Sequence, residues 1–525
     1  MGQPSDMIKL LLLLCGILPL STLWPESEVP VRQRRPNILF AIADDHSFPH
    51  ASAYGSRMFR TPNFDRVAAE GVLFYNAFVA APQCSPSRAS ILTGRNIWQL
   101  EEAGTHSSYF PSKFPVFTDA LEGVGYAIGY TGKAWDPGNW EDAGRSRNPV
   151  GPEYNSKRFP TVPSKGISAI DYAANFEDFL SRKTSDQPFF FWYGAHEPHR
   201  VYEAGSGQRD GFETVDAEIP AFLPKDSVVR RDMEDYAHEI GWFDRQLGRM
   251  IELLEQRGEL DNTIIIVTAD NGMAYPYAKA NLQEFGTHVP LAIRGPYVQG
   301  KRRKVNDLVS LADIAPTVLE MAGIAPMAGM SARSIMPVLS RQDDAKTDPA
   351  RNFVVTGRER HTHSRPDNLG YPARALRDGR FLYIRNLKPD RWPAGDPPPE
   401  SPSAGPLPKG MKPIVEGYED IDASPVKSHI LRNKKTYTEA YGLGYTKRPS
   451  EQLFDIIADP GCTRDLAGQR DHHTIQKRMA ARLDSVLKAQ GDPRVTDRGD
   501  VFETYPRFGG MRPFPGFREQ GKYNQ

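Results

Sequence analysis

The stretch Asn37-Ile-Leu-Phe-Ala-Ile-Ala-Asp-Asp-His46 decides the expected fold, because an uncharged run passes directly into three polar residues. Residues 37–43 do not alternate between apolar and polar side chains, as a strand with one wet face would. Such a continuous run is typical of a strand that is buried on both faces of a parallel sheet. We therefore expect Asp44 and Asp45 at the carboxyl end of a central strand.

Three other apolar stretches end in polar groups in the same way. They are Tyr126–Thr131 before Gly132-Lys133, Phe189–Ala195 before His196-Glu197-Pro198-His199, and Ile264–Ala269 before Asp270-Asn271-Gly272. Buried strands that alternate with helical stretches predict a parallel sheet covered by helices. Ligands bind beyond the carboxyl ends of the strands in such sheets. All four polar groups are therefore expected at one edge, in one site.

The composition fits a large globular protein with a balanced charge. The chain has 525 residues, of which 39% are hydrophobic, and this length suits two or three domains. Its 65 basic and 65 acidic residues argue against a bulk nucleic-acid binder or a generic membrane-surface protein, so a site for an anion must be locally positive. The 45 prolines and 44 glycines predict many ordered loops and exclude collagen-like and coiled-coil structures.

The N-terminus resembles a secretory signal. Lys9 precedes the short apolar run Leu10–Leu20, which predicts a signal peptide over residues 1–24 and a secreted or periplasmic protein. The run falls short of the roughly 20 residues that a spanning helix needs, and no stable membrane span is expected elsewhere. An uncleaved anchor and a lipoprotein at Cys15 are the alternatives. Cys84 and Cys462 lie far apart, so no disulfide framework is expected.

Two pairs of oxygen ligands point to a metal. Asp44, Asp45, Asp270 and Asn271 follow two of the predicted strands. Carboxylates that are held close together repel each other unless a cation joins them, and a set of hard oxygen ligands suits Ca²⁺ or Mg²⁺ better than zinc. The alternative is that Asp44 caps a helix and that Asp270-Asn271-Gly272 is a turn. The position of both pairs at strand ends favours the metal.

The stretch Cys84-Ser-Pro-Ser-Arg88 predicts an anion site with a nucleophile. Pro86 suits the first turn of a helix, which places Cys84 at the helix N-terminus. Free backbone N–H groups there favour an anion, and the guanidinium of Arg88 adds a forked donor for oxyanions. An unmodified thiol in this position is predicted to be a nucleophile with a low pKa.

Together with the trailing Thr93-Gly94-Arg95, this stretch resembles the signature of the formylglycine-dependent (type I) sulfatases. In that family a maturation enzyme oxidises the signature cysteine to formylglycine. The resemblance extends over nearly the whole chain after the signal and includes Arg35–Phe40, Thr61–Asp65, Thr131–Lys133, His196–His199, Thr268–Gly272, Val309–Thr317 and Glu451–Pro460. It implies an α/β, alkaline-phosphatase-like mixed or parallel sheet between helices, followed by a smaller C-terminal α+β domain with an antiparallel sheet.

The resemblance also implies a mechanism and roles for residues. One hydroxyl of the formylglycine hydrate at position 84 would attack sulfur, and the other would then expel sulfate. His199 would give a proton to the leaving group. Asp44, Asp45, Asp270 and Asn271 would bind one Ca²⁺ per chain, and Arg88 would support the hydrate and the metal. Lys133, His199 and Lys279 would contact the sulfate.

One position departs from the family pattern. The family usually has Gly-Lys-x-His, whereas this chain has Gly132-Lys133-Ala134-Trp135. Because an indole cannot transfer protons at neutral pH, more of the acid–base work falls to His199. His106 is a candidate to enter the pocket in place of the missing histidine. The alternative is that His106 is an ordinary surface residue.

Within the family, the chain is similar to the heparan N-sulfatases (sulfamidases). The similarity lies in Pro188–Arg200, Asp270–Leu282 and Gly286–Leu291. It implies release of sulfate from N-sulfoglucosamine, with O-desulfation of an algal (ulvan-like) or glycosaminoglycan polysaccharide as the alternative. A phosphoesterase or phosphonate hydrolase of the same superfold and a non-catalytic glycan-binding protein remain as other classes. The neutral net charge favours a confined basic pocket, and hence exo action.

A further group of polar residues follows Phe353–Val355, which is expected to be another strand ending at the same edge. Candidates for binding sugar hydroxyls or carboxylates are Glu359, Arg360, His361, His363 and Arg374. The alternative is a charged surface loop.

The domain organisation is predicted as a catalytic domain over 31–370 and a C-terminal subdomain over 371–525. The subdomain is expected to contain a hairpin turning at Asp378-Gly379, a Pro-rich loop over 392–413, and a helix from about Ile475 to Gln490. The tail after Asp497 is expected to wrap around the body or the pocket rim.

Overall fold

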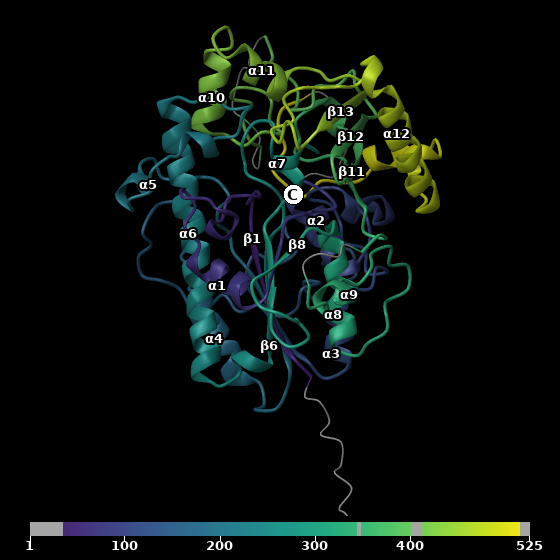
Figure 1. Cartoon of the computed structure of the whole chain (residues 1–525). Helices are drawn as coiled ribbons and strands as arrows, with labels where there is room; N and C mark the ends of the chain where they lie inside the picture. The colour runs from purple at the N-terminus through teal and green to yellow at the C-terminus, as the bar shows by residue number, and fades with distance from the viewer. Residues whose placement is uncertain (1–34, 344–347, 401–406, 408–410, 515–525) are drawn as a thin grey trace, which may run out of the picture. The chain divides into compact units, whose positions relative to one another are not determined.

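Four parallel strands on one side of a sheet bring their carboxyl ends to a common edge (Figure 1). Strand β1 (Asn37–Ala43) lies between β5 (Phe189–Gly194) and β6 (Thr263–Ala269), and β4 (Ala127–Gly132) pairs with β5. All three pairings are parallel. Every residue of β1 is buried, which explains why its sequence shows no alternation. The four strands predicted from uncharged runs, and their common edge, are confirmed.

The computed structural model describes residues 35–343, 348–400, 407 and 411–514. The predicted signal peptide and part of the Pro-rich loop lie outside these residues. Within them, no helix is both long and apolar enough to cross a membrane. Cys84 and Cys462 are both free thiols, in keeping with the expectation of no disulfide framework.

Three shorter strands complete the sheet and make it mixed. They are β7 (Leu291–Arg294), β2 (Val72–Phe74) and β8 (Arg303–Val305), and the full order is β4-β5-β1-β6-β7-β2-β8. Strand β7 runs antiparallel to both β6 and β2. Strands β2 and β8 pair in parallel, so β7 is the strand that makes the sheet mixed.

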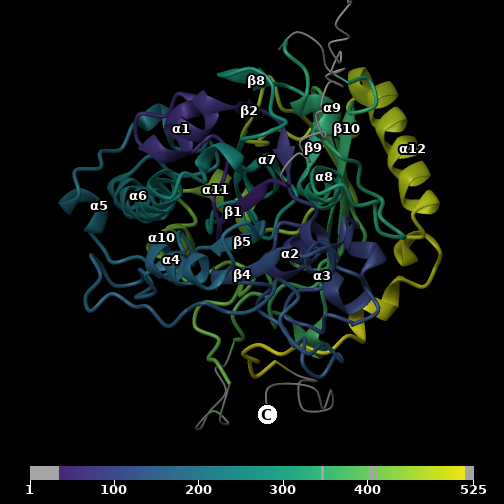
Figure 2. The same cartoon turned by 90° about the horizontal axis from the view of Figure 1, so that it is seen from below.

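Helices cover both faces of this sheet (Figure 2). One face carries α1 (Pro62–Glu70), α4 (Tyr172–Arg182) and α6 (Ser227–Gln256); the other carries α2 (Cys84–Thr93), α3 (Phe117–Gly123) and α8 (Ile314–Met321). In α6 the apolar residues that recur at helical spacing from Tyr236 to Leu254 are buried and form the core-facing side. Gly258 follows this helix with a φ of +65°, a left-handed conformation that glycine adopts readily after a helix end.

A second, antiparallel sheet lies above the polar edge of the first. Its order is β10 (Phe353–Arg358), β11 (Ala373–Asp378), β12 (Phe381–Asn386) and β13 (Glu451–Asp455). Strands β11 and β12 form the predicted hairpin. The expectation that Phe353–Val355 ends at the edge of the first sheet is wrong. Val354 packs on Phe78 and Leu308, whereas Val355 packs on the other face of the second sheet, in the cluster that contains Leu376. The apolar run therefore indicates a strand that is buried on both faces, but it does not indicate which sheet the strand joins.

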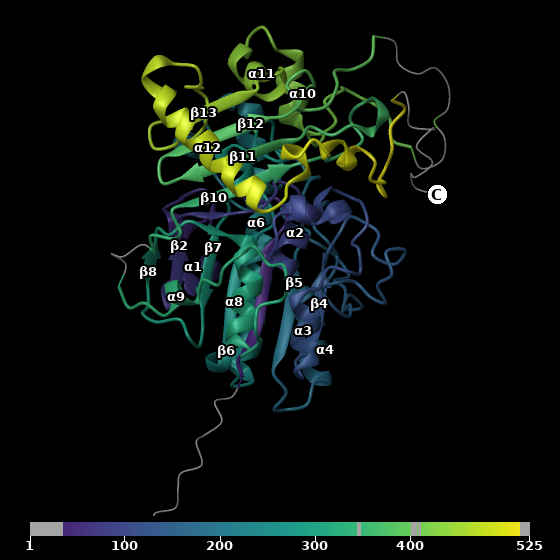
Figure 3. The same ribbon diagram turned by 90° about the vertical axis from the view of Figure 1, so that its right-hand side faces the viewer.

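The second sheet has two apolar faces, and successive side chains along its strands pack into separate clusters on either side. Leu382 and Ile384 join a cluster that includes α10 (Pro425–Arg432) and part of α6. Phe381 and Tyr383 point to the opposite face and pack against α12 (His473–Ala489), which crosses the sheet (Figure 3). The predicted terminal helix is confirmed, and it starts two residues earlier than expected. The predicted domain boundary near 365–375 stays a prediction.

The remaining strands and helices are short. They are β3 (Ala77–Phe78), α5 (Ser206–Arg209), α7 (Glu284–Thr287), β9 (Val309–Ser310), α9 (Met336–Leu339) and α11 (Thr438–Tyr445).

A buried ion-pair group centred on Asp420 ties the end of β10 to the segment before α10. One carboxylate oxygen of Asp420 lies 2.9 Å from both Arg358 and Arg365, and the other accepts a hydrogen bond from the backbone N–H of Thr362 at 2.9 Å. Burial alone would raise the pKa of Asp420, but Arg365 and Arg358 lower it far below its usual value. Asp420 is therefore charged and compensates two buried guanidinium groups.

Replacing Asp420 by Asn should lower the free energy of unfolding by about 3–5 kcal/mol, because an amide leaves two buried guanidinium charges without a counter-ion. Chemical denaturation of the purified protein measures this loss. Asp500→Asn is the matched control, since the Asp500 side chain is 83% exposed and should tolerate the same change. Equal stability of D420N and D500N would contradict this account.

Candidate active site

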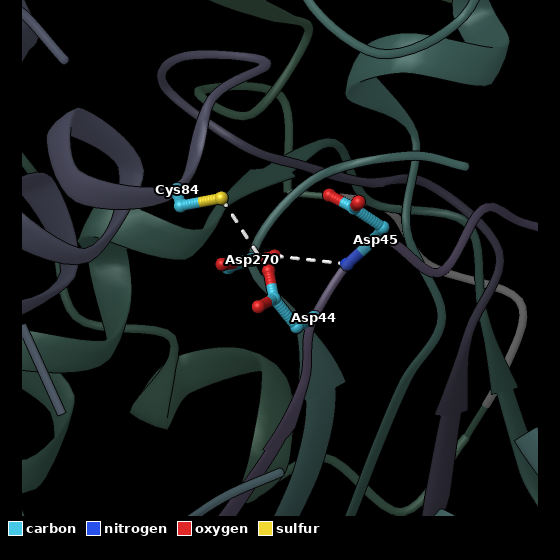
Figure 4. Close-up of side chains that lie close together, drawn as sticks. All are labelled: Asp44, Asp45, Cys84 and Asp270. Atoms are coloured by element: carbon cyan, nitrogen blue, oxygen red, sulfur yellow. Dashed lines mark hydrogen bonds between the residues drawn. The ribbon is translucent and has the colours of Figure 1, made fainter. Parts of the chain in front are cut away.

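The ends of β1 and β6 meet the start of α2 in a buried acidic group (Figure 4). The thiol of Cys84 donates a hydrogen bond to Asp44 at 3.4 Å, and the backbone N–H of Asp45 donates to Asp270 at 3.2 Å. Each of these four residues offers one ligand atom, and these atoms lie within 4.8 Å of one another. The structure therefore brings together the strand ends and the cysteine that the sequence placed in one site.

Helix α2 starts at Cys84, so the thiol stands at the helix N-terminus as predicted. The residue after it is held from two sides. The indole N–H of Trp135 donates to the carbonyl oxygen of Ser85 at 3.0 Å, and the backbone N–H of Ser107 donates to the Ser85 hydroxyl at 3.0 Å. Trp135, which replaces the family's usual histidine, thus fixes the start of the helix that carries Cys84.

Each carboxylate of the site is paired with a cation. Lys133 Nζ lies 2.6 Å from Asp44, Lys279 Nζ lies 2.7 Å from Asp45, and Arg88 Nε lies 2.8 Å from Asp270. All six side chains are buried, so these charges interact with little screening by water. The three predicted basic residues therefore balance the three predicted acidic ones.

The charge of Asp44 is the best stabilised of the three carboxylates. Burial raises its pKa, but the charges of Lys133, His199 and Arg88 together bring the pKa well below its usual value. Asp44 is therefore ionised at neutral pH. It is also the residue that touches Cys84, so a negative charge lies directly beside the thiol.

Asp270 and Asp45 hold their charges less easily. Burial and the neighbouring Asp44 raise the pKa of Asp270 to about 6, in spite of Arg88. Burial also raises the pKa of Asp45, and Lys279 offsets only part of that effect. Carboxylates that repel in this way are stabilised when a cation binds between them.

The amide of Asn271 indicates which cation fits. Its Nδ2 donates to Asp45 at 2.7 Å and to the carbonyl of Gly272 at 2.9 Å, while its Oδ1 is buried with no hydrogen-bond partner among the described residues. A buried carbonyl oxygen without a donor is costly, and a hard cation satisfies it. Three carboxylate groups and this amide oxygen fit a hard divalent cation such as Ca²⁺ or Mg²⁺.

The prediction that the unmodified Cys84 thiol has a low pKa is wrong. Complete burial and the charge of Asp44 raise the pKa of the thiol well above its usual value, and Lys133 and Lys279 do not compensate. The sequence showed the helix N-terminus and the basic residues, but the burial and the contact with Asp44 arise only in the fold. The thiol itself is therefore a poor nucleophile.

Two partly exposed side chains mark the side on which the site opens. His199 is 35% exposed, and its Nε2 lies 3.8 Å from Asp45. Asp422, whose side chain is 28% exposed, lies 3.2 Å from the Lys279 ammonium. Asp422 was missed by the sequence analysis, because a single aspartate in the segment before α10 carries no signal of its position. A leaving group can reach His199 from this side.

His106 and His361 lie together near the site. Their ring centroids are 4.6 Å apart, and Nδ1 of His106 lies 3.1 Å from the carbonyl oxygen of His361. Burial lowers the pKa of His361 to about 3 and that of His106 well below its usual value, and the charge of Lys279 contributes to both shifts. Both imidazoles are therefore neutral, and both are close enough to Lys279 to feel its charge.

The other predicted sugar-binding residues form ion pairs and hydrogen bonds with the C-terminal part of the chain. Arg374 lies 2.6 Å from Asp492 and 2.8 Å from Glu359, which also pairs with Arg494 at 2.6 Å. Because Glu359 and Arg374 are fully buried and paired, the structure gives them a role in stability and does not bring them to the site. Arg360 donates to the carbonyls of Tyr505 and Pro506, and His363 accepts from the backbone N–H of Arg512.

Comparison with known proteins identifies the class that this fold and site define. A sequence model described as Sulfatase matches residues 36–324, which is more than half of the chain. The chain therefore belongs to the sulfatase family, has its alkaline-phosphatase-like fold, and is a sulfuric ester hydrolase. The resemblance stated from the sequence is confirmed.

Individual relatives agree with this assignment. The chain is 27% identical over 485 residues to an ulvan-active sulfatase of Formosa agariphila, covering 87% of this chain and 76% of the relative. It is 27% identical over 397 residues to the human N-sulphoglucosamine sulphohydrolase, covering 68% and 74%. A solved protein bound to its substrate D-glucosamine-2-N,6-O-disulfate superposes with a TM-score of 0.60 at 19% identity, covering 87% and 98%.

In unconverted protein kept metal-free with EDTA, Cys84 should react with iodoacetamide at pH 8.5 at least about tenfold more slowly than in the denatured chain. A raised pKa and burial both lower the amount of accessible thiolate. Mass spectrometry of the labelled peptides gives the two rates. Cys462, which is also buried with a raised pKa, is the internal control. Rapid labelling of native Cys84 alone would mean that its thiol is activated.

Proposed function

We propose that this sulfatase removes sulfate from a sulfated saccharide, with residue 84 converted to formylglycine and Ca²⁺ held by Asp44, Asp45, Asp270 and Asn271. The observation that carries the proposal is the position of Cys84, the first residue of a helix, within 4.8 Å of three buried carboxylates. A thiol whose pKa is raised is unsuited to attack sulfur, which supports conversion of this residue. Because Cys84 is buried, a maturation enzyme would have to reach it before the chain folds.

When present, formylglycine supplies a hydrated aldehyde as the nucleophile, and Ca²⁺ polarises the sulfate oxygens. The chain's own residues bind and orient the sulfate. Lys133 and Lys279 place two ammonium groups beside the carboxylates. Arg88 has a buried Nη2 without a hydrogen-bond partner in the described chain, which is a free donor for an oxyanion.

His199 is proposed to hold the proton that the leaving group needs. It is the more exposed of the two side chains on the open side of the site, and Trp135 cannot share its task because an indole does not transfer protons at neutral pH. His106 and His361, which are neutral, would accept or donate hydrogen bonds to the saccharide. Export from the cell, as the predicted signal peptide implies, belongs to this proposal.

N-sulfoglucosamine is the first candidate for the sulfated unit, and the human relative named N-sulphoglucosamine sulphohydrolase supports it. An O-sulfated unit of an algal or glycosaminoglycan polysaccharide is the second candidate. Two observations favour it: the relative named ulvan-active sulfatase, and Trp135 in place of the histidine that sulfamidases keep. The neutral net charge of the chain favours action at a chain end in either case.

Sulfate release from defined saccharides should depend on residue 84. Enzyme matured at this position should release sulfate from N-sulfoglucosamine or from one of the O-sulfated units of glucosamine, uronic acid, galactose or rhamnose. Cys84→Ala should lose about a thousandfold or more in kcat/KM, because it lacks the nucleophile. Cys462→Ala, at the other buried cysteine, should keep the wild-type rate.

Two outcomes would count against the proposed function. Turnover of phosphate or phosphonate esters, with no sulfate released, would favour the related phosphoesterases. A Cys84 peptide that remains an unconverted thiol in a host with maturation machinery, together with saccharide binding, would favour a binding protein.

Calcium should stabilise the protein against unfolding. At 100 times its dissociation constant, an ion that binds only the folded state adds about 2.7 kcal/mol, which a thermal shift after EDTA treatment will detect. Asp270→Asn should weaken the shift, whereas Asp119→Asn, at a half-exposed side chain, should not.

Because metal-free Asp270 has a pKa of about 6, protons compete for it, and calcium affinity should fall as the pH is lowered through 6. The absence of any calcium-dependent shift would argue against the metal site.

A further inference from the structure

The tail after Asp497 brings one arginine back to the active-site side of the molecule. The backbone N–H of Phe508 donates to the carbonyl of Ser107 at 2.7 Å, and Arg507 Nη1 donates to the carbonyl of His361 at 2.6 Å. The same Nη1 lies 3.4 Å from Nδ1 of His106. The guanidinium of Arg507 thus contacts the ring of His106 and the backbone of His361, and its side chain is buried.

Arg507 has no carboxylate partner in the part of the chain that the structure describes. Other buried arginines do: Arg88 pairs with Asp270, and Arg374 pairs with Asp492. Burial, followed by the positive charges of Arg360 and Arg512, lowers the pKa of Arg507 to about 9. A buried guanidinium without a counter-ion is unfavourable, so its retention points to an anion that arrives with a ligand.

A neighbouring arginine adds to the same positive charge. Arg360 donates to the carbonyl oxygens of Tyr505 and Pro506, and among the described residues it makes no ion pair. Burial lowers its pKa to about 10. Carbonyl oxygens satisfy its N–H groups but do not neutralise its charge, so two cations without an ion-pair partner among the described residues lie where the tail meets the body.

Donors of this cluster also remain free. Arg507 Nε and the hydroxyl of Ser107 are buried with no hydrogen-bond partner among the described residues. Gly509 packs directly against the guanidinium and the hydroxyl, because a Cβ at that position would lie 2.7 Å from Arg507 Nη2 and 2.9 Å from Ser107 Oγ. Any larger residue at 509 would therefore displace the guanidinium.

The cluster is linked to the nucleophile position through a single hydrogen bond. Ser107 donates from its backbone N–H to the hydroxyl of Ser85, the residue after Cys84. His106 is close enough to Lys279 and Lys133 for both charges to lower its pKa. A saccharide with its sulfate at residue 84 would therefore have a neighbouring substituent within reach of Arg507.

We propose that Arg507 and Ser107 form a second oxyanion subsite, which binds another anionic group of the saccharide beside the sulfate that is removed. This inference rests on the proposed function. The chemistry is that of a forked guanidinium and a hydroxyl donating to a carboxylate or sulfate group. The preferred substrate then carries two anionic groups: the scissile sulfate, and either a uronate carboxylate or a second sulfate.

The test compares kcat/KM for three matched saccharides: one with a single sulfate, one with a sulfate and a uronate carboxylate, and one with two sulfates. Wild-type enzyme should prefer a doubly charged saccharide. In Arg507→Gln this preference should fall about tenfold or more, mainly through KM, and Arg507→Lys should keep part of it. If kcat/KM falls more for the saccharide with the uronate carboxylate, the second group is a carboxylate; if it falls more for the saccharide with two sulfates, the second group is a sulfate.

Controls separate the subsite from a structural role. Arg498→Gln removes an exposed arginine of the same tail and should leave the preference as in wild type. Gly509→Ala displaces the guanidinium without changing the charge and should also lower the preference for a doubly charged saccharide. If thermal unfolding shows that R507Q does not fold, G509A serves as the test in its place. An equal fall in kcat/KM for all three saccharides would overturn the subsite. Failure of matured wild-type enzyme to release sulfate from any saccharide would overturn the proposed function itself.

Discussion

Three carboxylates buried at one edge of a sheet are the constraint on which the site depends. Burial alone would force Asp44, Asp45 and Asp270 to take up protons, so the fold must supply opposite charge at short range. Lys133 and Lys279 do so for the two residues after β1, and Arg88 does so for the residue after β6. Arg88 also donates to the carbonyls of residues 133 and 134, which joins α2 to the loop after β4. The electrostatic requirement of the acidic group therefore fixes the relative positions of three elements.

The second sheet takes part in this balance. Lys279 lies between Asp45 and Asp422, and Asp422 belongs to the segment before α10. That segment is held by Asp420, whose carboxylate pairs with Arg358 at the end of β10 and with Arg365. A buried ion-pair group thus connects the antiparallel sheet to a lysine of the site. The C-terminal part of the chain completes the open side of the active site and does not merely cover it.

The strands and the site edge could be predicted because they depend on local pattern. An uncharged run such as 37–43 indicates burial on both faces, and the polar residues that follow it must lie at the strand end. The same reasoning failed for 353–355, because a doubly buried run says nothing about which sheet it joins. It also failed for the pKa of the Cys84 thiol, which depends on burial and on Asp44, a residue 40 positions away in the sequence. Asp422 reaches the site, and Arg507 reaches His106 and His361, only through long-range packing, and no pattern around them shows it.

The two charged clusters differ in a way that bears on the substrate. In the first, the carboxylates of Asp44, Asp45, Asp270 and Asp422 face three cations, so a bound calcium ion would leave one positive charge there. A sulfate group then restores the balance. In the second, Arg507 and Arg360 face carbonyl oxygens and neutral histidines, and neither arginine makes an ion pair with a described carboxylate. A saccharide with one anionic group can balance only the first cluster. In a chain whose total charge is zero, positive charge gathered at two adjacent places favours a ligand that carries an anionic group for each.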